Sequence, residues 1–289
     1  MSGGDRPRTS LTRLQMLREM GLSPLWRLRP HASRLPSQPL EGVAAAVSEA
    51  DHQASGGPAV AVVPPGTVPA AAGDRAGEIA GMGWDELRRS VADCRACSLC
   101  QARRQAVLGV GDLNADWLFI GEGPGAEEDA RGEPFVGPAG KLLDAMLAAI
   151  DLQRGDDVYI ANAVKCRPPG NRTPEAAEIA ACAPYLRRQI ALLQPRLIVL
   201  LGRAAAHAVL GEVGSLASMR GQSFQYRSPA GGENIPVIVS YHPAYLLRTL
   251  TDKARAWEDL CRARALMRAA RATSAGPDPG VGQGVTTTP

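Results

Sequence analysis

The sequence holds six cysteines whose spacing suits metal chemistry. They form a close run of three, a pair 16 residues apart, and one thiol nearer the C-terminus: Cys94, Cys97, Cys100, Cys166, Cys182 and Cys261. Two close thiols and two distant ones suit a zinc ion or an iron–sulfur cluster. Zinc sites usually take their second pair from a tight C-x2-C or H-x3-H unit, and no histidine neighbours the second pair here, which favours the cluster. Spacing alone does not choose four ligands from the first five cysteines, and Cys261 is expected to be an ordinary buried thiol.

One of these cysteines lies in a stiff basic stretch, NAVKCRPPGNR, which begins at Asn162. Lys165 and Arg167 flank Cys166 and favour its thiolate form. The same cations, together with Arg172, suit an anionic partner. Asn162 follows an apolar run directly, so its amide is expected at a strand end, where it can both donate and accept hydrogen bonds.

Two further polar segments follow apolar runs. The segment GEGPG contains Gly121, Gly123 and Gly125, which let the backbone approach a ligand closely. His242 follows the run IPVIVS after one tyrosine and precedes a proline, so it is expected to project from a stiff loop. Glycine-rich turns are common in α/β proteins, so the glycine segment by itself is a weak signal.

The elements that position these residues alternate between strand and helix. Apolar runs predict strands at 116–120, 158–161, 196–201 and 235–240. Helical patterns lie at 84–94, 139–150, 174–193, 203–210 and 252–271. This order predicts an α/β fold, a three-layer α/β/α sandwich with a central, mainly parallel four-stranded sheet. Ligands of such sheets bind at the carboxyl ends of the strands, where the polar segments fall.

The composition divides the 289-residue chain into four parts. We expect an N-terminal helical segment at 1–29, a disordered Pro/Ala/Gly-rich linker at 30–80, a folded domain at 81–271 and a disordered tail at 272–289. The N-terminal helix is expected to dock a protein partner, with an Arg-rich transit peptide as the alternative.

The location of the chain is also bounded by its composition. No run of 18 apolar residues predicts a membrane span, and no apolar segment after the basic N-terminus predicts a secretory signal. A cytoplasmic, reducing location is therefore expected, where six cysteines favour metal binding over disulfides. The net charge of +3 does not by itself indicate nucleic acid.

Three motifs together resemble a known family. They are GEGPGAEEDARGEPFVGPAG (121–140), NAVKCRPPGNR (162–172) and YHPAYLLR (241–248), preceded by C-x2-C. In this order they resemble family 4 uracil-DNA glycosylases, which belong to the uracil-DNA glycosylase superfamily and carry a 4Fe–4S cluster. The resemblance implies a monomeric enzyme of base excision repair that acts on uracil in single- and double-stranded DNA.

The resemblance also assigns the metal ligands. It implies that the cluster is held by Cys94, Cys97, Cys166 and Cys182, with Cys100 as a bystander. A related cross-linking subgroup carries a histidine in an inserted basic loop after the second strand. The segment KCRPPGNR has no histidine, so an ordinary turnover enzyme is expected.

The chemistry of N-glycosidic cleavage suggests roles for the polar residues. Phe135 can stack on a flipped base, and Asn162 can tell uracil from cytosine by pairing with its edge. His242 can donate a hydrogen bond to the base oxygen where negative charge develops. Glu122 is the predicted water-positioning carboxylate, with the Gly121–Gly125 backbone as an alternative. By resemblance, Glu128 would crowd a 5-methyl group and exclude thymine.

The remaining predictions concern DNA. Lys165, Arg167 and Arg172 are expected to grip phosphates, with Arg248 alongside. Leu246 or Leu247 is expected to fill the gap that a flipped base leaves.

Two other functions are compatible with part of the sequence. A non-catalytic metal-cluster module that binds nucleic acid would use the cysteines and cations but has no need for the Phe135, Asn162 and His242 set. A phosphate hydrolase built on GEGPG lacks the Lys-Ser/Thr pair that follows the glycines of a phosphate loop.

Overall fold

The computed structural model describes residues 74–211, 214–227 and 234–274. The expected N-terminal helix, most of the expected linker and residues 275–289 of the expected tail lie outside these ranges.

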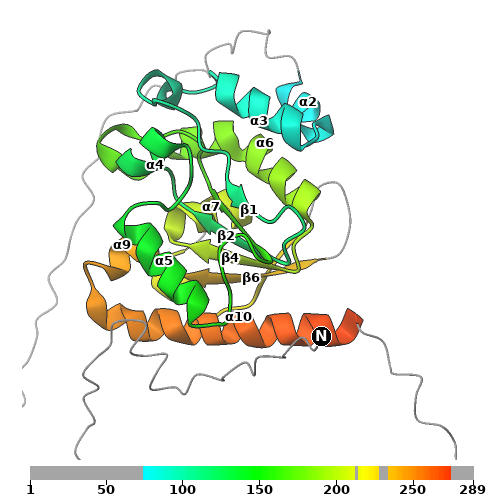
Figure 1. The fold of residues 1–289 in the computed structure, drawn as a ribbon, viewed down its shortest axis with the longest axis vertical. Coiled ribbons are helices and arrows are strands. Elements are labelled where there is room, and N and C mark those ends of the chain that lie inside the picture. The colour runs from blue at the N-terminus through cyan, green and yellow to red at the C-terminus, as the bar shows by residue number, and fades with distance from the viewer. Residues whose placement is uncertain (1–73, 212–213, 228–233, 275–289) are drawn as a thin grey trace, which may run out of the picture. The chain divides into compact units, whose positions relative to one another are not determined.

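A six-stranded sheet in the order β1-β3-β2-β4-β6-β5 forms the centre of the described part (Figure 1). Its inner strands are parallel and match the four predicted ones: β2 (Trp117–Gly121), β3 (Val158–Asn162), β4 (Leu197–Leu201) and β6 (Ile235–Ser240). The two edge strands, β1 (Val110–Gly111) and β5 (Phe224–Tyr226), are antiparallel. The expected strand number of four was therefore too low, because the edge strands are too short to give a periodic signal.

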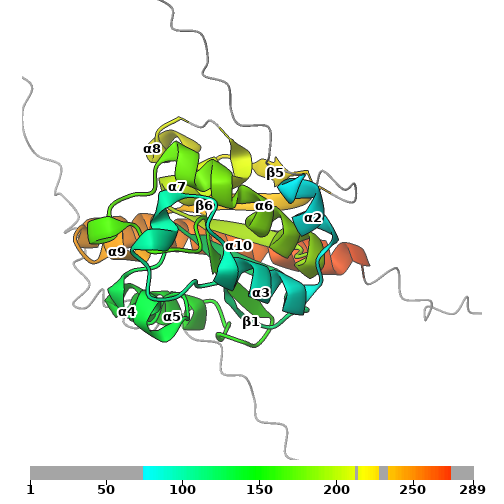
Figure 2. The same ribbon diagram turned by 90° about the horizontal axis from the view of Figure 1, so that it is seen from above.

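Helices cover both faces of the sheet, which confirms the expected α/β class (Figures 1 and 2). One layer holds α2 (Arg75–Gly81), α3 (Trp84–Asp93), α6 (Ala176–Leu193), α7 (Arg203–Leu210) and α8 (Leu216–Met219). The other holds α5 (Pro138–Ala148), α9 (Pro243–Leu246) and α10 (Lys253–Ser274). A short helix, α4 (Ala126–Arg131), follows β2, and 3-10 turns lie at Ser98–Gln101, Pro169–Asn171 and Leu250–Asp252.

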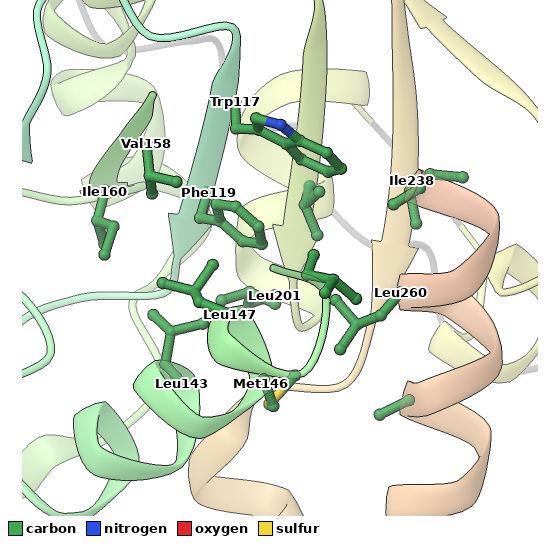
Figure 3. Close-up of a cluster of buried hydrophobic side chains, with 14 of the residues drawn as sticks. Trp117, Phe119, Leu143, Met146, Leu147, Val158, Ile160, Leu201, Ile238 and Leu260 are labelled. Carbon is green, nitrogen blue, oxygen red and sulfur yellow. The ribbon is translucent and has the colours of Figure 1, made fainter. Parts of the chain in front are cut away.

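Apolar side chains from both layers bury the sheet. Phe119 of β2 packs with Leu143 and Leu147 of α5 on one face, where Ile238 of β6 also packs with Leu260 of α10 (Figure 3). On the other face, Leu118 of β2 packs in a cluster with Leu186 of α6. Each such side chain contributes about 1.5–3 kcal/mol when fully buried. All residues of β2, β3 and β4 are buried, as the continuously apolar strands predicted.

Helix α2 corrects the expected linker boundary, because residues 75–80 are helical. Asp74 caps this helix by accepting a hydrogen bond from the Gly77 N–H at 2.9 Å. Ile79 is buried against the core, and Arg75 donates to the Ala181 carbonyl of α6 at 3.0 Å. The sequence did not predict this helix, because one capping residue, Asp74, and one buried apolar residue, Ile79, do not give a periodic pattern. At the other end α10 extends through residue 274, so the first residues of the expected tail are also helical.

In the described ranges, none of the helices combines the length and the apolar character needed to cross a bilayer.

Gly140 provides a test of the packing between α5 and the loop before it. A Cβ at this position would lie 1.8 Å from the Phe135 carbonyl oxygen. Alanine usually stabilises a helix interior by about 0.5–1 kcal/mol relative to glycine, but overpacking here costs about 1–3 kcal/mol. We predict that Gly140→Ala lowers the melting temperature measured by circular dichroism.

The matched control is Gly81→Ala, because a Cβ there meets nothing within 4 Å. It is expected to melt at or above the wild-type temperature. If Gly140→Ala has the same melting temperature as Gly81→Ala, the contact between α5 and the Phe135 carbonyl is looser than the distance of 1.8 Å indicates.

Candidate active site

The carboxyl ends of the parallel strands meet at one edge of the sheet, where a pocket of about 550 Å³ opens. Asn162 ends β3, and Glu122 follows β2. His242 follows β6 and caps α9. The topology thus brings the three expected catalytic residues together, with Phe135, around one cavity.

Gly121, the last residue of β2, shapes this pocket from behind. A Cβ on Gly121 would lie 2.4 Å from Cζ of Phe135 and 2.5 Å from Oδ1 of Asn162. The glycine is therefore required by the protein's own side chains, which cover it. Gly123 and Gly125 line the pocket, whereas Gly121 supports it from behind, and its expected contact with substrate stays a prediction.

Asn162 is only 2% exposed, yet its side-chain oxygen has no hydrogen-bond partner among the described residues. Leaving a buried acceptor unsatisfied costs about 1–3 kcal/mol. Because Asn162 lines the pocket, a ligand that brings an N–H to this oxygen recovers that cost.

Phe135 presents its ring in an unusual backbone conformation, with φ at 56°. The ring stacks on the imidazole of His242, with ring centres 5.4 Å apart and planes 27° from parallel. A flat apolar surface therefore borders the pocket beside a polar ring.

His242 is held as a neutral hydrogen-bond donor. Its Nδ1 accepts a hydrogen bond from the Ala244 N–H at 3.1 Å, which leaves the proton on Nε2. Burial, which is the largest cause, and the positive charge of Arg248 together lower the pKa of His242 to about 4, although the negative charge of Glu128 opposes the shift. The imidazole is thus uncharged at neutral pH.

Two carboxylates lie in the pocket wall with different surroundings. Glu122 is half-buried, and its carboxylate has no hydrogen-bond or ion-pair partner within the described ranges. Glu128 accepts hydrogen bonds from the backbone N–H groups of Gly125, Val136 and Gly137 at 3.0–3.1 Å. Glu122 is therefore available for a reactant, whereas Glu128 is fixed in place by the loop it holds.

A second, smaller cavity is lined by five of the cysteines, Cys94, Cys97, Cys100, Cys166 and Cys182. Cys166 and Cys182 are buried. Within the described ranges, no three Cys, His, Asp or Glu side chains are arranged to hold a single metal ion. The thiols are spread around the cavity, which suits a polynuclear cluster better than one zinc ion. Cys261 is exposed on α10, so the expectation that it is buried was wrong.

Cations surround these thiols. Arg103 donates to the Cys166 sulfur at 2.8 Å, and Arg75 approaches the Cys94 sulfur at 3.6 Å. Lys165 lines the same cavity. These cations favour the thiolate forms that metal binding requires, but burial outweighs them at two of the thiols: it raises the pKa of Cys166 and raises the pKa of Cys182 to about 11.

Residues 108–261 match the family model of the uracil DNA glycosylase superfamily. A type-4 uracil-DNA glycosylase of Archaeoglobus fulgidus is 43% identical over 167 residues, which cover 56% of this chain and 82% of the relative. One of Thermotoga maritima is 42% identical over 181 residues, 62% of this chain and 91% of the relative. The chain belongs to the uracil DNA glycosylase superfamily. A type-5 enzyme of Thermus thermophilus is 36% identical over 47% of this chain and 68% of the relative, so the resemblance to family 4 is confirmed by the higher identities.

For this superfamily member, the structure corrects two of the expected DNA contacts. Lys165 is 1% exposed, and its Nζ donates to the Asn162 carbonyl at 2.8 Å, so it cannot reach a phosphate. Burial lowers the pKa of Lys165 to about 8. Leu246 is fully buried because the turn of α9 directs it into the core. The adjacent Leu247 is 41% exposed and is left as the candidate wedge.

The other cations of the glycosylase lie nearer the pocket rim. Arg172 and Arg248 line the pocket, although Arg172 also pairs with Glu178 at 2.7 Å. Nε of Arg167 donates a hydrogen bond to Oδ1 of Asn171 at 2.7 Å. Arg203, at the start of α7, is exposed and lines the pocket as well. Sequence analysis missed it, although its place directly after the expected strand 196–201 was the available signal.

The protonation of His242 can be measured in the intact glycosylase. We predict a titration midpoint near pH 4 by NMR of the imidazole, instead of its ordinary value of 6.5, because burial disfavours the charged form. The signal is assigned by its disappearance in His242→Gln. A midpoint at the ordinary value would mean that the ring is solvated and charged for part of the physiological pH range.

Proposed function

We propose that this protein is a uracil-DNA glycosylase, which flips uracil out of DNA and hydrolyses its N-glycosidic bond in base excision repair. The observation that carries this proposal is the buried, unpartnered Asn162 oxygen in a pocket shared with a neutral His242 and the Phe135 ring. The relatives' names support the same activity.

Base recognition follows from hydrogen-bond polarity. The N3–H of uracil can donate to the Asn162 oxygen, while the amide nitrogen donates to O4 of the base. Cytosine presents an acceptor at N3 and a donor at N4, so both pairings fail in that amide orientation. Glu128 supports the exclusion of thymine, because its three backbone hydrogen bonds prevent it from moving away from a 5-methyl group.

Bond cleavage uses His242 and Glu122. As the C1′–N1 bond breaks, its electron pair moves onto uracil, and the Nε2–H of His242 stabilises the resulting anion at a base oxygen. The sugar gains positive charge, which the Glu122 carboxylate stabilises. Water bonds to C1′ and its proton passes to Glu122, leaving an abasic site and a uracil anion. The anion takes up a proton from solvent, and Glu122 returns its proton to solvent, which restores the enzyme.

DNA binding uses the pocket rim. We assign phosphate contacts to Arg203 and Arg248, with Arg167 and Arg172 contributing after they loosen their contacts within the protein. Leu247 fills the space that the flipped nucleotide leaves in the stack. Binding is expected to weaken as salt rises.

The cysteine cavity fits a 4Fe–4S cluster held by Cys94, Cys97, Cys166 and Cys182. The fit rests on the spread of the thiols around one cavity and on the cations that offset their negative charge. When bound, the cluster supplies a cross-link between the segment after α3, the basic loop and α6. Lys165 links the cysteine cavity to the active site. Its backbone N–H donates to the Cys182 sulfur at 3.3 Å, and its side-chain Nζ donates to the Asn162 carbonyl at 2.8 Å.

The activity is tested with single- and double-stranded DNA that contains one uracil. We expect abasic sites to form without added metal or nucleotide. His242→Ala should slow release about 10²–10³-fold, as for the loss of one anion-stabilising donor. Asn162→Ala should also lose most activity, because the pairing with the uracil edge is lost. Alkali cleavage of the product strand measures both.

The control is Asn114→Ala, an exposed asparagine outside the pocket, which should retain the wild-type rate. DNA binding by the iron-containing wild type without uracil release would identify a non-catalytic module instead.

The cofactor is tested by chemical analysis. The wild type should contain about four iron atoms per chain and show the visible absorbance of Cys-ligated iron. Cys166→Ser should lose most of the iron, because one of four ligands is removed, whereas Cys261→Ser should keep it. Full iron and colour in Cys166→Ser would reassign the ligands.

A further inference from the structure

The loop that carries Phe135 is held in a conformation that its sequence does not favour. A positive φ is uncommon for non-glycine residues and unfavourable for a bulky side chain, so surrounding contacts must maintain it. Phe135 lies between α4 and α5, with its ring against Gly121 and His242. A relaxed backbone would turn the ring away from both.

Arg154 supplies contacts that hold this backbone. Its Nη1 donates to the Pro134 carbonyl at 2.9 Å, and its Nη2 donates to the Phe135 carbonyl at 2.8 Å. Asp144 of α5 accepts from Nε and Nη2 of the same guanidinium at 3.1 and 2.8 Å, which fixes its orientation. A planar guanidinium is suited to two such parallel contacts, and a lysine could not reproduce both.

Contacts on the far side of Phe135 complete the restraint. Glu128 accepts hydrogen bonds from the N–H groups of Val136 and Gly137. The peptide group between Phe135 and Val136 is therefore held at its carbonyl by Arg154 and at its N–H by Glu128. Arg154 also holds the preceding peptide group through the Pro134 carbonyl. Glu128 lines the pocket, whereas Arg154 does not.

We propose that Arg154 is a positioning residue of the active site, which holds the Phe135 ring at the base-binding position from outside the pocket. This role rests on the proposed function, because it assumes that Phe135 stacks on uracil. Asp144 serves the same role one step further out by orienting Arg154. No sequence motif identifies Arg154, since the contacts that position Phe135 are to backbone carbonyls.

The test compares Arg154→Met, Arg154→Lys and Phe135→Leu in the full chain. Misplacement of a substrate contact by about 1 Å can cost about 10²-fold in rate. We expect Arg154→Met to lower the single-turnover rate of uracil release to this extent with little change in DNA affinity, because Arg154 does not line the pocket. Arg154→Lys should recover the rate only in part.

Two controls separate positioning from general stability. Arg264→Met removes an arginine of similar exposure, 27% against 24%, that pairs with Asp151, and it should keep the wild-type rate. In the Phe135→Leu background, adding Arg154→Met should change the rate by no more than about twofold, because the ring through which Arg154 acts is absent. A full additive loss in the double variant would overturn the proposal.

A third readout does not depend on uracil release. The Phe135 ring shifts the NMR signals of the His242 ring protons, since the two rings are stacked. In Arg154→Met these signals should move toward their positions in Phe135→Leu. Unchanged signals would overturn the positioning role, even if uracil is released. If the wild type releases no uracil, the proposed function is refuted. The shifts of the His242 ring protons still test whether Arg154 positions the Phe135 ring, because that measurement needs no substrate.

Discussion

The pocket depends on one packing constraint, the close approach of Phe135 and Asn162 to the α-carbon of Gly121. Any side chain at that position would displace both groups, because a Cβ would lie within 2.5 Å of each. Gly121 pairs with Asn162 of β3, and the strand residues before it pair with both β3 and β4, so this α-carbon is held next to Asn162 by the sheet itself. The Phe135 ring and the Asn162 amide are thereby held in place by the backbone, which leaves them little freedom to rearrange around different ligands.

The loop after β3 joins this pocket to the cysteine cavity. Lys165 is buried between them and contacts Cys182 through its backbone and Asn162 through its side chain. An ammonium group without water needs a nearby negative charge or carbonyl, and here it has a carbonyl beside a ring of thiols. Lys165 therefore stabilises the protein interior, whereas Arg172 and Arg248 lie at the pocket rim.

Sequence reasoning predicted the inner sheet because its strands are continuously apolar and its helices are amphipathic. It also predicted the convergence of Asn162 and His242, because parallel strands end at one edge. It failed where a single residue's direction matters. Lys165 and Leu246 were expected to face DNA, yet the turn of the backbone after each strand directs them inward. The role of Arg154 was not predicted, because every residue has a backbone carbonyl and the sequence does not show which ones an arginine contacts. The short edge strands and α2 depend on tertiary contacts.

We infer that the buried Asn162 oxygen accepts a hydrogen bond from the N3–H of bound uracil. A crystal structure of the iron-containing protein with free uracil tests it directly. We expect the base to lie against Phe135, with N3 within hydrogen-bond distance of the Asn162 oxygen and Nε2 of His242 in contact with a base oxygen. Uracil bound elsewhere, or bound here with the Asn162 oxygen still unpartnered, would contradict it.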